Sequence, residues 1–82
     1  GSDLVIGLWT GYGVDKVLTG TTHNTTKVID GLPSTVGLRI GMAVAGTSVG
    51  ASNYIKTIDS NTQVTTNVDS TATSTESITF TT

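Results

Sequence analysis

The sequence predicts an all-β fold, a small antiparallel β-sandwich or barrel of six to eight short strands. Three observations point to it. Apolar residues recur with a period of two, turn-forming residues interrupt these runs every 8–12 positions or so, and threonine accounts for eighteen of the 82 residues. Threonine is β-branched, which disfavours helix and suits a pleated strand. Because the apolar residues keep strand spacing and only one proline is present, a folded chain is favoured over a disordered, mucin-like one.

The first strand is expected over residues 3–9, and its apolar side chains point to both faces. Such a strand must be covered on both sides, so it is predicted to lie centrally or at a contact between subunits. The candidate subunit-contact residues are Leu4, Ile6, Leu8 and Trp9.

The rest of the first half alternates short extended runs with polar loops. After a turn or bulge at 11–13, a strand is expected over 14–18, followed by a loop at 21–26 that ends in a strand over 26–30. An extended crossing is predicted at 32–36, because the residue before a proline is biased away from helix.

The second half predicts a hairpin-rich meander. A bent strand is expected where Leu38, Ile40, Met42 and Val44 alternate with other residues. Further strands are expected at 54–58 and 63–68, joined by a turn at 59–62 whose short polar side chains can bond the local backbone. A last strand with Ile78 and Phe80 on one side runs to residue 82. All of this fits one domain over residues 1–82, and the opening Gly1-Ser2 suggests a domain excised from a longer protein.

Composition excludes several classes of function. The chain has no cysteine. Its formal net charge is −2, and its four basic residues are scattered, so it lacks the cluster of positive charge that binding to nucleic acid requires. No apolar run approaches the roughly 18 residues that cross a bilayer, so membrane insertion is not expected. A single histidine cannot form a zinc site without several carboxylate partners, and no cofactor is expected.

Catalysis and metal binding are disfavoured in the same way. His23 with Asp30 or Asp15 could supply a general base and its orienting carboxylate, but catalysis also needs a nucleophile, oxyanion donors and a pocket, and the abundance of Ser and Thr makes chance matches nearly certain. The loop histidine is instead expected to be solvated. The run Asp59-Ser60-Asn61 is rich in oxygen but lacks the spacing of a calcium loop, so a hairpin turn is favoured. Asn24-Thr25-Thr26 fits an N-glycosylation sequon, which matters only in a protein exported by a eukaryote.

Three segments of the second half carry a resemblance to a known class of module. The runs "GLRIGMAVAG", "IKTIDSNTQVTT" and "STATSTESITFTT" resemble a repeated Thr/Gly-rich β module of bacteriophage tail-fibre, tailspike and related virion or cell-surface fibre proteins. The resemblance covers residues 26–82 and departs from the usual pattern at 48–51. It implies a domain on a virion surface or in the extracellular space, with no reaction of its own. Fibres of this kind are typically threefold, which implies a homotrimer.

Two function classes remain open. The first is a non-enzymatic structural or assembly module of such a fibre, in the form of a knob, spacer or decoration domain. The second is a tip domain that binds a cell-surface receptor or glycan, because exposed aromatic rings stack on sugars and nearby amides bond their hydroxyls. Burial of the aromatic rings in the core or at a subunit contact is preferred. The candidate ligand contacts are Trp9, Tyr12, Asn24, Asn53 and Tyr54.

Overall fold

The computed structural model describes residues 15–82, and regular secondary structure in that range consists of strands alone. This confirms the all-β prediction. The six strands are β2 (Lys16–Thr22), β3 (Val28–Asp30), β4 (Ala43–Ala45), β5 (Asn53–Ser60), β6 (Gln63–Thr66) and β7 (Ser74–Thr81).

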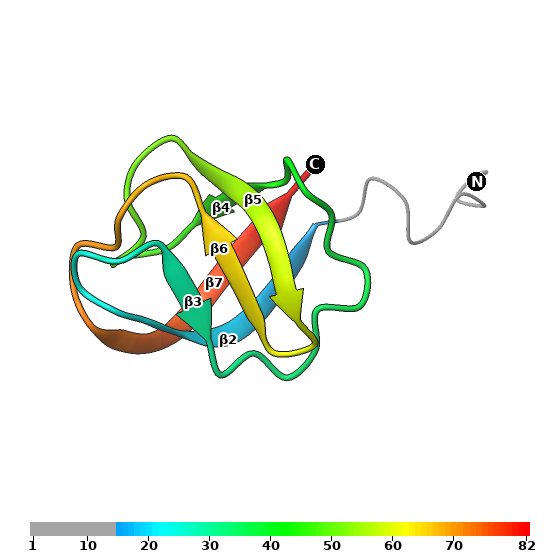
Figure 1. The fold of residues 1–82 in the computed structure, drawn as a ribbon, viewed down its shortest axis with the longest axis horizontal. Helices are drawn as coiled ribbons and strands as arrows, with labels where there is room; N and C mark the ends of the chain where they lie inside the picture. Colours follow the sequence, from blue (N-terminus) through cyan, green and yellow to red (C-terminus); the bar gives the residue numbers. More distant parts are fainter. Residues whose placement is uncertain (1–14) are drawn as a thin grey trace.

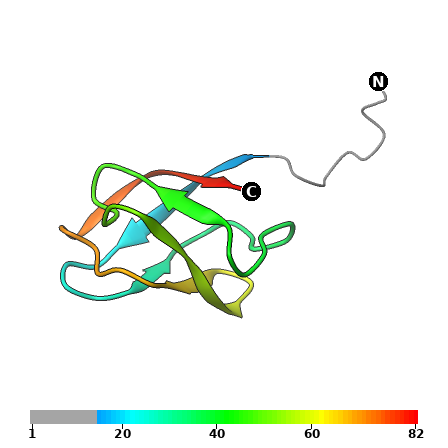
Figure 2. The same cartoon turned by 90° about the horizontal axis from the view of Figure 1, so that it is seen from above.

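The strands close into a barrel in the order β2-β3-β6-β5-β4-β7, and every neighbouring pair is antiparallel. Figure 1 looks across the barrel, and Figure 2 shows its strands from above. Of the two expected architectures, the barrel is therefore the correct one. Closure has a physical benefit, because each of the six described strands has a partner on both sides along part of its length, which reduces the strand edge left unpaired.

The core is formed by the inward-pointing residues of the strands and by apolar residues of the long β3–β4 connection. Alternation along β7 illustrates the pattern, since Ile78 and Phe80 are fully buried while their neighbours face outward. The buried apolar residues are Ile29, Leu32, Leu38, Met42, Val44, Val49, Ile55, Val64, Ile78 and Phe80.

Gly20 lets two parts of this core approach β2. It occupies an inward-pointing position, and a Cβ atom there would lie 2.8 Å from Leu32 Cδ2 and 3.1 Å from Ile78 Cδ1. Any side chain would displace these core groups. β2 consequently passes through Gly20 and ends at Thr22, so the expected loop over 21–26 begins later than predicted.

The strand expected around Leu38–Val44 is the largest departure from the sequence reading. Only Ala43–Ala45 is extended, and turns occupy 36–37 and 40–41. Gly41 has a φ of +96°, which breaks the extended path, and Ile40 is 67% exposed although its pattern neighbours are buried. The two-residue period therefore does not mark one strand here.

Other strand ends shift by a few residues. The segment expected over 26–30 is a strand only within β3, and the segment expected over 63–68 is a strand only within β6. The last strand begins at Ser74. The β5–β6 hairpin is confirmed, with Ser60 paired to Gln63 across a two-residue turn. Its register shifts twice, between Ile55 and Thr57 and between Ile58 and Ser60.

The two ends of the described chain lie side by side. β2 and β7 pair antiparallel over seven residues, from Lys16 opposite Phe80 to Thr22 opposite Ser74. The chain thus enters the barrel and leaves it at the same end, as the adjacent start of β2 and end of β7 show in Figures 1 and 2.

Candidate functional site

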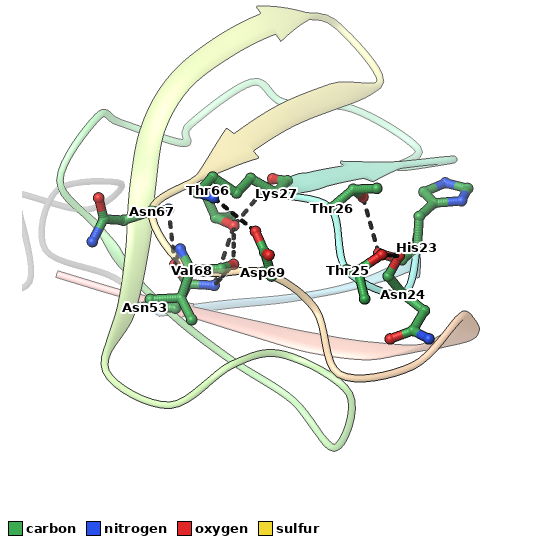
Figure 3. A network of polar contacts seen from close by, with 10 residues as sticks. All are labelled: His23, Asn24, Thr25, Thr26, Lys27, Asn53, Thr66, Asn67, Val68 and Asp69. Atoms are coloured by element: carbon green, nitrogen blue, oxygen red, sulfur yellow. Dashed lines mark hydrogen bonds and ion pairs between the residues drawn. The ribbon is translucent and has the colours of Figure 1, made fainter.

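The densest group of polar contacts lies where the β2–β3 loop meets the β6–β7 loop. Thr25 donates its backbone N–H to the carbonyl of Ser70 at 2.9 Å, and Ser70 donates its own N–H to the carbonyl of Thr26 at 2.8 Å. Asn24 and Ser70 also form an isolated parallel bridge. The two loops, far apart in sequence, are therefore joined by their backbones, and Figure 3 shows the side chains around this junction.

Asn53 is the centre of the network and is only 5% exposed. Its Oδ1 atom accepts hydrogen bonds from three backbone N–H groups, those of Tyr54 at 3.0 Å and of Asn67 and Val68 at 2.9 Å each. Its Nδ2 group donates to Thr66 Oγ1 and to the carbonyl of Val68, both at 3.1 Å. Both polar atoms of the amide are therefore used within the protein, which disfavours Asn53 as a ligand contact.

Thr66 extends the network to the β2–β3 loop. Its hydroxyl, fully buried, lies 3.1 Å from the carbonyl oxygens of both Lys27 and Val68. The Lys27 ammonium in turn contacts Asp69 Oδ1 at 2.7 Å, with both side chains half exposed. In Figure 3 the Asn67 side chain points away from these contacts. The chemistry of this network is therefore that of a structural clamp between loops.

A second buried threonine closes the same end of the barrel. Thr22 Oγ1 donates to the carbonyl of Ala72 at 2.7 Å and accepts from the N–H of Ser74 at 3.1 Å. One polar atom of this region differs from the rest, because Ser70 Oγ is buried without a hydrogen-bond partner among the described residues. An orphan hydroxyl of this kind reduces stability.

His23 is partly exposed to solvent and is paired with a carboxylate. Its Nε2 atom lies 2.9 Å from Asp30 Oδ1, and the two side chains are 39% and 40% exposed. Within residues 15–82 the ring makes no hydrogen bond to a hydroxyl that could serve as a nucleophile. The pair is a histidine with its carboxylate and lacks the third member that nucleophilic catalysis needs.

The Asp59 carboxylate is saturated by protein donors. It accepts hydrogen bonds from Thr65 at 2.6 Å, Thr57 at 2.8 Å and Gln63 at 3.2 Å. These bonds, that from Thr65 foremost, lower the pKa of Asp59 below its ordinary value of 3.8. No group of three or more potential metal ligands occurs among the described residues. Asp59 stabilises the β5–β6 hairpin, in line with the turn favoured over a calcium loop.

Two of the remaining candidate ligand contacts, Tyr54 and Asn24, lie in the described part of the chain. Tyr54 is 40% exposed and shares a row with Ala43 and Thr81, at the end of β7 where the chain leaves the barrel. Asn24 is exposed in the β2–β3 loop and is bridged to Ser70, whereas the carbonyl of Tyr54 accepts the N–H of Asn67, three residues earlier in the same β6–β7 loop. Trp9 and Tyr12, together with the candidate subunit contacts Leu4, Ile6 and Leu8, lie outside the described residues.

A shallow, open groove occurs near residue 82. Its volume is about 290 Å³, and it is lined by Arg39, Ile40, Gly41, Met42 and Thr82. The groove has neither the depth nor the converging polar groups of a typical small-molecule site. As for the membrane, the part of the chain from residue 15 onward contains no helix long and apolar enough to span a bilayer.

Sequence reasoning missed the buried polar residues that organise this end of the barrel. Thr66 follows Val64 at a spacing of two and so belongs to the inward face, which was a usable signal. Asn53 carried no such signal, because its role depends on a loop 14 residues further along the chain. Comparison of the chain with protein-family models, with curated proteins and with solved structures finds no match.

Proposed function

We propose that this chain is a non-enzymatic structural module, a knob or decoration domain of a virion or fibre surface, and that it assembles with copies of itself as a homotrimer. The observation that carries this proposal is the adjacent entry and exit of the chain at Lys16 and Phe80. A spacer that continues a fibre in line needs its ends at opposite poles. A domain with both ends together projects sideways from its attachment or forms its tip.

The hydrogen-bonding pattern supports the same proposal. Three of the buried polar side chains, those of Asn53, Thr66 and Thr22, form hydrogen bonds that join loops to the barrel. The closed barrel also resists uncontrolled strand pairing, which a domain displayed at high local density requires.

Receptor or glycan binding at the tip of such a fibre is the second candidate. It draws on the exposed Tyr54 ring, which could stack on a sugar. Its weakness is that the amide of Asn53, the residue next to Tyr54, is occupied by hydrogen bonds within the protein. A glycan microarray probed with the full chain tests it, and Tyr54→Ala should abolish any signal that comes from this surface.

The assembly proposal is tested by size-exclusion chromatography with light scattering on the full chain. The expected mass is that of three 8.4 kDa chains. Leu8→Asp and Trp9→Ala should weaken assembly, because these apolar residues need cover that a thin single core cannot supply. A chain that stays monomeric at tens of micromolar would refute the proposal.

A further inference from the structure

The groove near residue 82 opens onto the apolar core. Met42, one of its lining residues, belongs to the core and is only 3% exposed, whereas Ile40 beside it is 67% exposed. Gly41 lies between them, and a Cβ atom added there would have nothing beyond its chain neighbours within 4 Å. The groove therefore combines a buried apolar residue and an exposed one with open space over the backbone of Gly41.

This groove lies where the described part of the chain begins. Lys16 pairs with Phe80, and Thr82, which lines the groove, is two residues further along the chain. Paired strands are about 4.8 Å apart, so Asp15 and Thr82 leave their strands side by side. Figure 2 shows the start of β2 next to the C-terminal end of β7. A segment that precedes Asp15 thus starts beside an uncovered opening to the core.

The sequence before Asp15 has the composition to cover this opening. The apolar run over 3–9 lies outside the described residues, and three of its large side chains occupy alternate positions on one side of an extended chain. They are Leu4, Ile6 and Leu8. Leu8 is seven positions before Asp15, a stretch that spans at most about 23 Å when extended. The glycines at 11 and 13 provide a turn within that stretch, so the run can double back to the groove.

We infer that the groove is the docking site for residues 3–9 of the same chain, with Leu8 packed against Ile40. Docking would bury the exposed Ile40 side chain and extend a core that is thin in a chain of this size. The inference is independent of the proposed assembly, because Trp9, on the other side of the run, stays available to a second copy. Leu8→Asp would then weaken assembly by releasing the segment that carries Trp9.

Tethering favours this occupant over a second copy of the chain or another protein. A segment joined to its site by a short linker has an effective concentration of about a millimolar. A second copy at tens of micromolar competes at a much lower concentration. The same apolar run therefore occupies the groove of its own barrel before it reaches that of a neighbour.

A double-mutant cycle in the full chain tests the contact between Leu8 and Ile40. Leu8→Ala, Ile40→Ala and the double variant are unfolded in urea and followed by circular dichroism. Ile40→Ala should lower the folding equilibrium constant about fivefold more in the otherwise wild-type chain than in the Leu8→Ala chain. In the control cycle Val17→Ala replaces Ile40→Ala, because Val17 is 62% exposed on the outer side of β2. Its effect should be the same in both backgrounds.

Trp9, the single tryptophan, provides a second measurement that does not depend on the stability of the barrel. A docked segment shields the indole from collisions, so acrylamide should quench its fluorescence less than in the chain unfolded in urea. Ile40→Asp places a carboxylate in the apolar contact and should raise the quenching constant towards the unfolded value. Val17→Asp should leave it unchanged.

The outcomes separate this inference from the proposed assembly. Additive effects of Leu8→Ala and Ile40→Ala would overturn the docking, as would quenching of Trp9 that Ile40→Asp does not alter. Coupling that disappears on dilution would assign the groove to the segment of a second copy and would overturn docking within one chain. Coupling that persists in a chain shown to be monomeric by light scattering supports the inference, although the proposed homotrimer would then fail.

Discussion

Asn53 and Thr66 place two polar side chains in an end of the barrel that apolar packing alone would leave undefined. The amide and the hydroxyl bond to each other at 3.1 Å and to the backbone of the β6–β7 loop. A satisfied buried network of this kind fixes one arrangement of the loops, because a shifted loop would leave buried polar groups without partners.

Replacing Asn53 with alanine should destabilise the protein by about 3 kcal/mol, since three backbone N–H groups lose their acceptor. Asn67→Ala is the matched control, because that side chain points away from the network in Figure 3. Urea unfolding monitored by circular dichroism measures both. Equal effects of the two substitutions would show that the Asn53 amide has no special role.

His23→Ala should leave stability and assembly almost unchanged. The pair with Asp30 is substantially exposed, and ion pairs in that setting contribute about 0–1 kcal/mol. The melting temperature and the oligomeric mass of the variant check this. A large fall in either would reveal a function of the His23–Asp30 pair beyond local packing.

At the scale of elements, loops pack so closely onto strands that two glycines, Gly20 and Gly50, have no room for a side chain. A Cβ at Gly50 would lie 2.7 Å from the backbone oxygen of Asp69, whereas the nearest atom at Gly20 is the end of the flexible Leu32 side chain, at 2.8 Å. Backbone cannot move aside as a side chain can. Gly50→Ala should therefore cost more free energy of unfolding than Gly20→Ala, which we expect to cost about 1–3 kcal/mol. Chemical denaturation of the two variants gives the order, and the reverse order would contradict it.

Glu76 accepts a hydrogen bond from the β4–β5 loop, and this bond should make the stability of the folded protein depend on pH in the acidic range. The N–H of Ser48 foremost lowers the pKa of this carboxyl below its ordinary value of 4.5. A lowered folded-state pKa contributes stability that is present above 4.5 and lost as the pH falls through the folded value. Glu76→Gln should thus flatten the decline of melting temperature below about pH 4.5, as thermal melts will show. An identical decline in both proteins would exclude Glu76 as a source, leaving Asp59, whose pKa is lowered in the same direction.

Prediction from sequence worked best where pattern and turn chemistry agreed. The β5–β6 hairpin and the inward side of β7 followed directly from alternation and from the turn residues between Asp59 and Gln63. The strand prediction failed at Ile40. Apolar residues can also recur with a two-residue period in a loop that places some of its side chains in the core. Prediction from sequence failed at Asn53 because the need for a buried amide arises from a distant loop and not from the local sequence.

At the scale of the whole molecule, two features organise the described part of the chain. The clamp of loops around Asn53 holds one end, and the ends of the described chain lie together at the start of β2 and the end of β7.

The pairing of β2 with β7 also determines how the domain would respond to mechanical force. Tension applied at Lys16 and Thr81 would act on the same end of two antiparallel strands. The hydrogen bonds between the strands would then break one after another, because the force would not be shared by all of them at once. Single-molecule pulling from these two positions should therefore unfold the domain at lower force than pulling from Lys16 and Ser74, which would shear the same strands. For the proposed decoration domain, this means that load along a fibre would have to pass through other parts of the assembly.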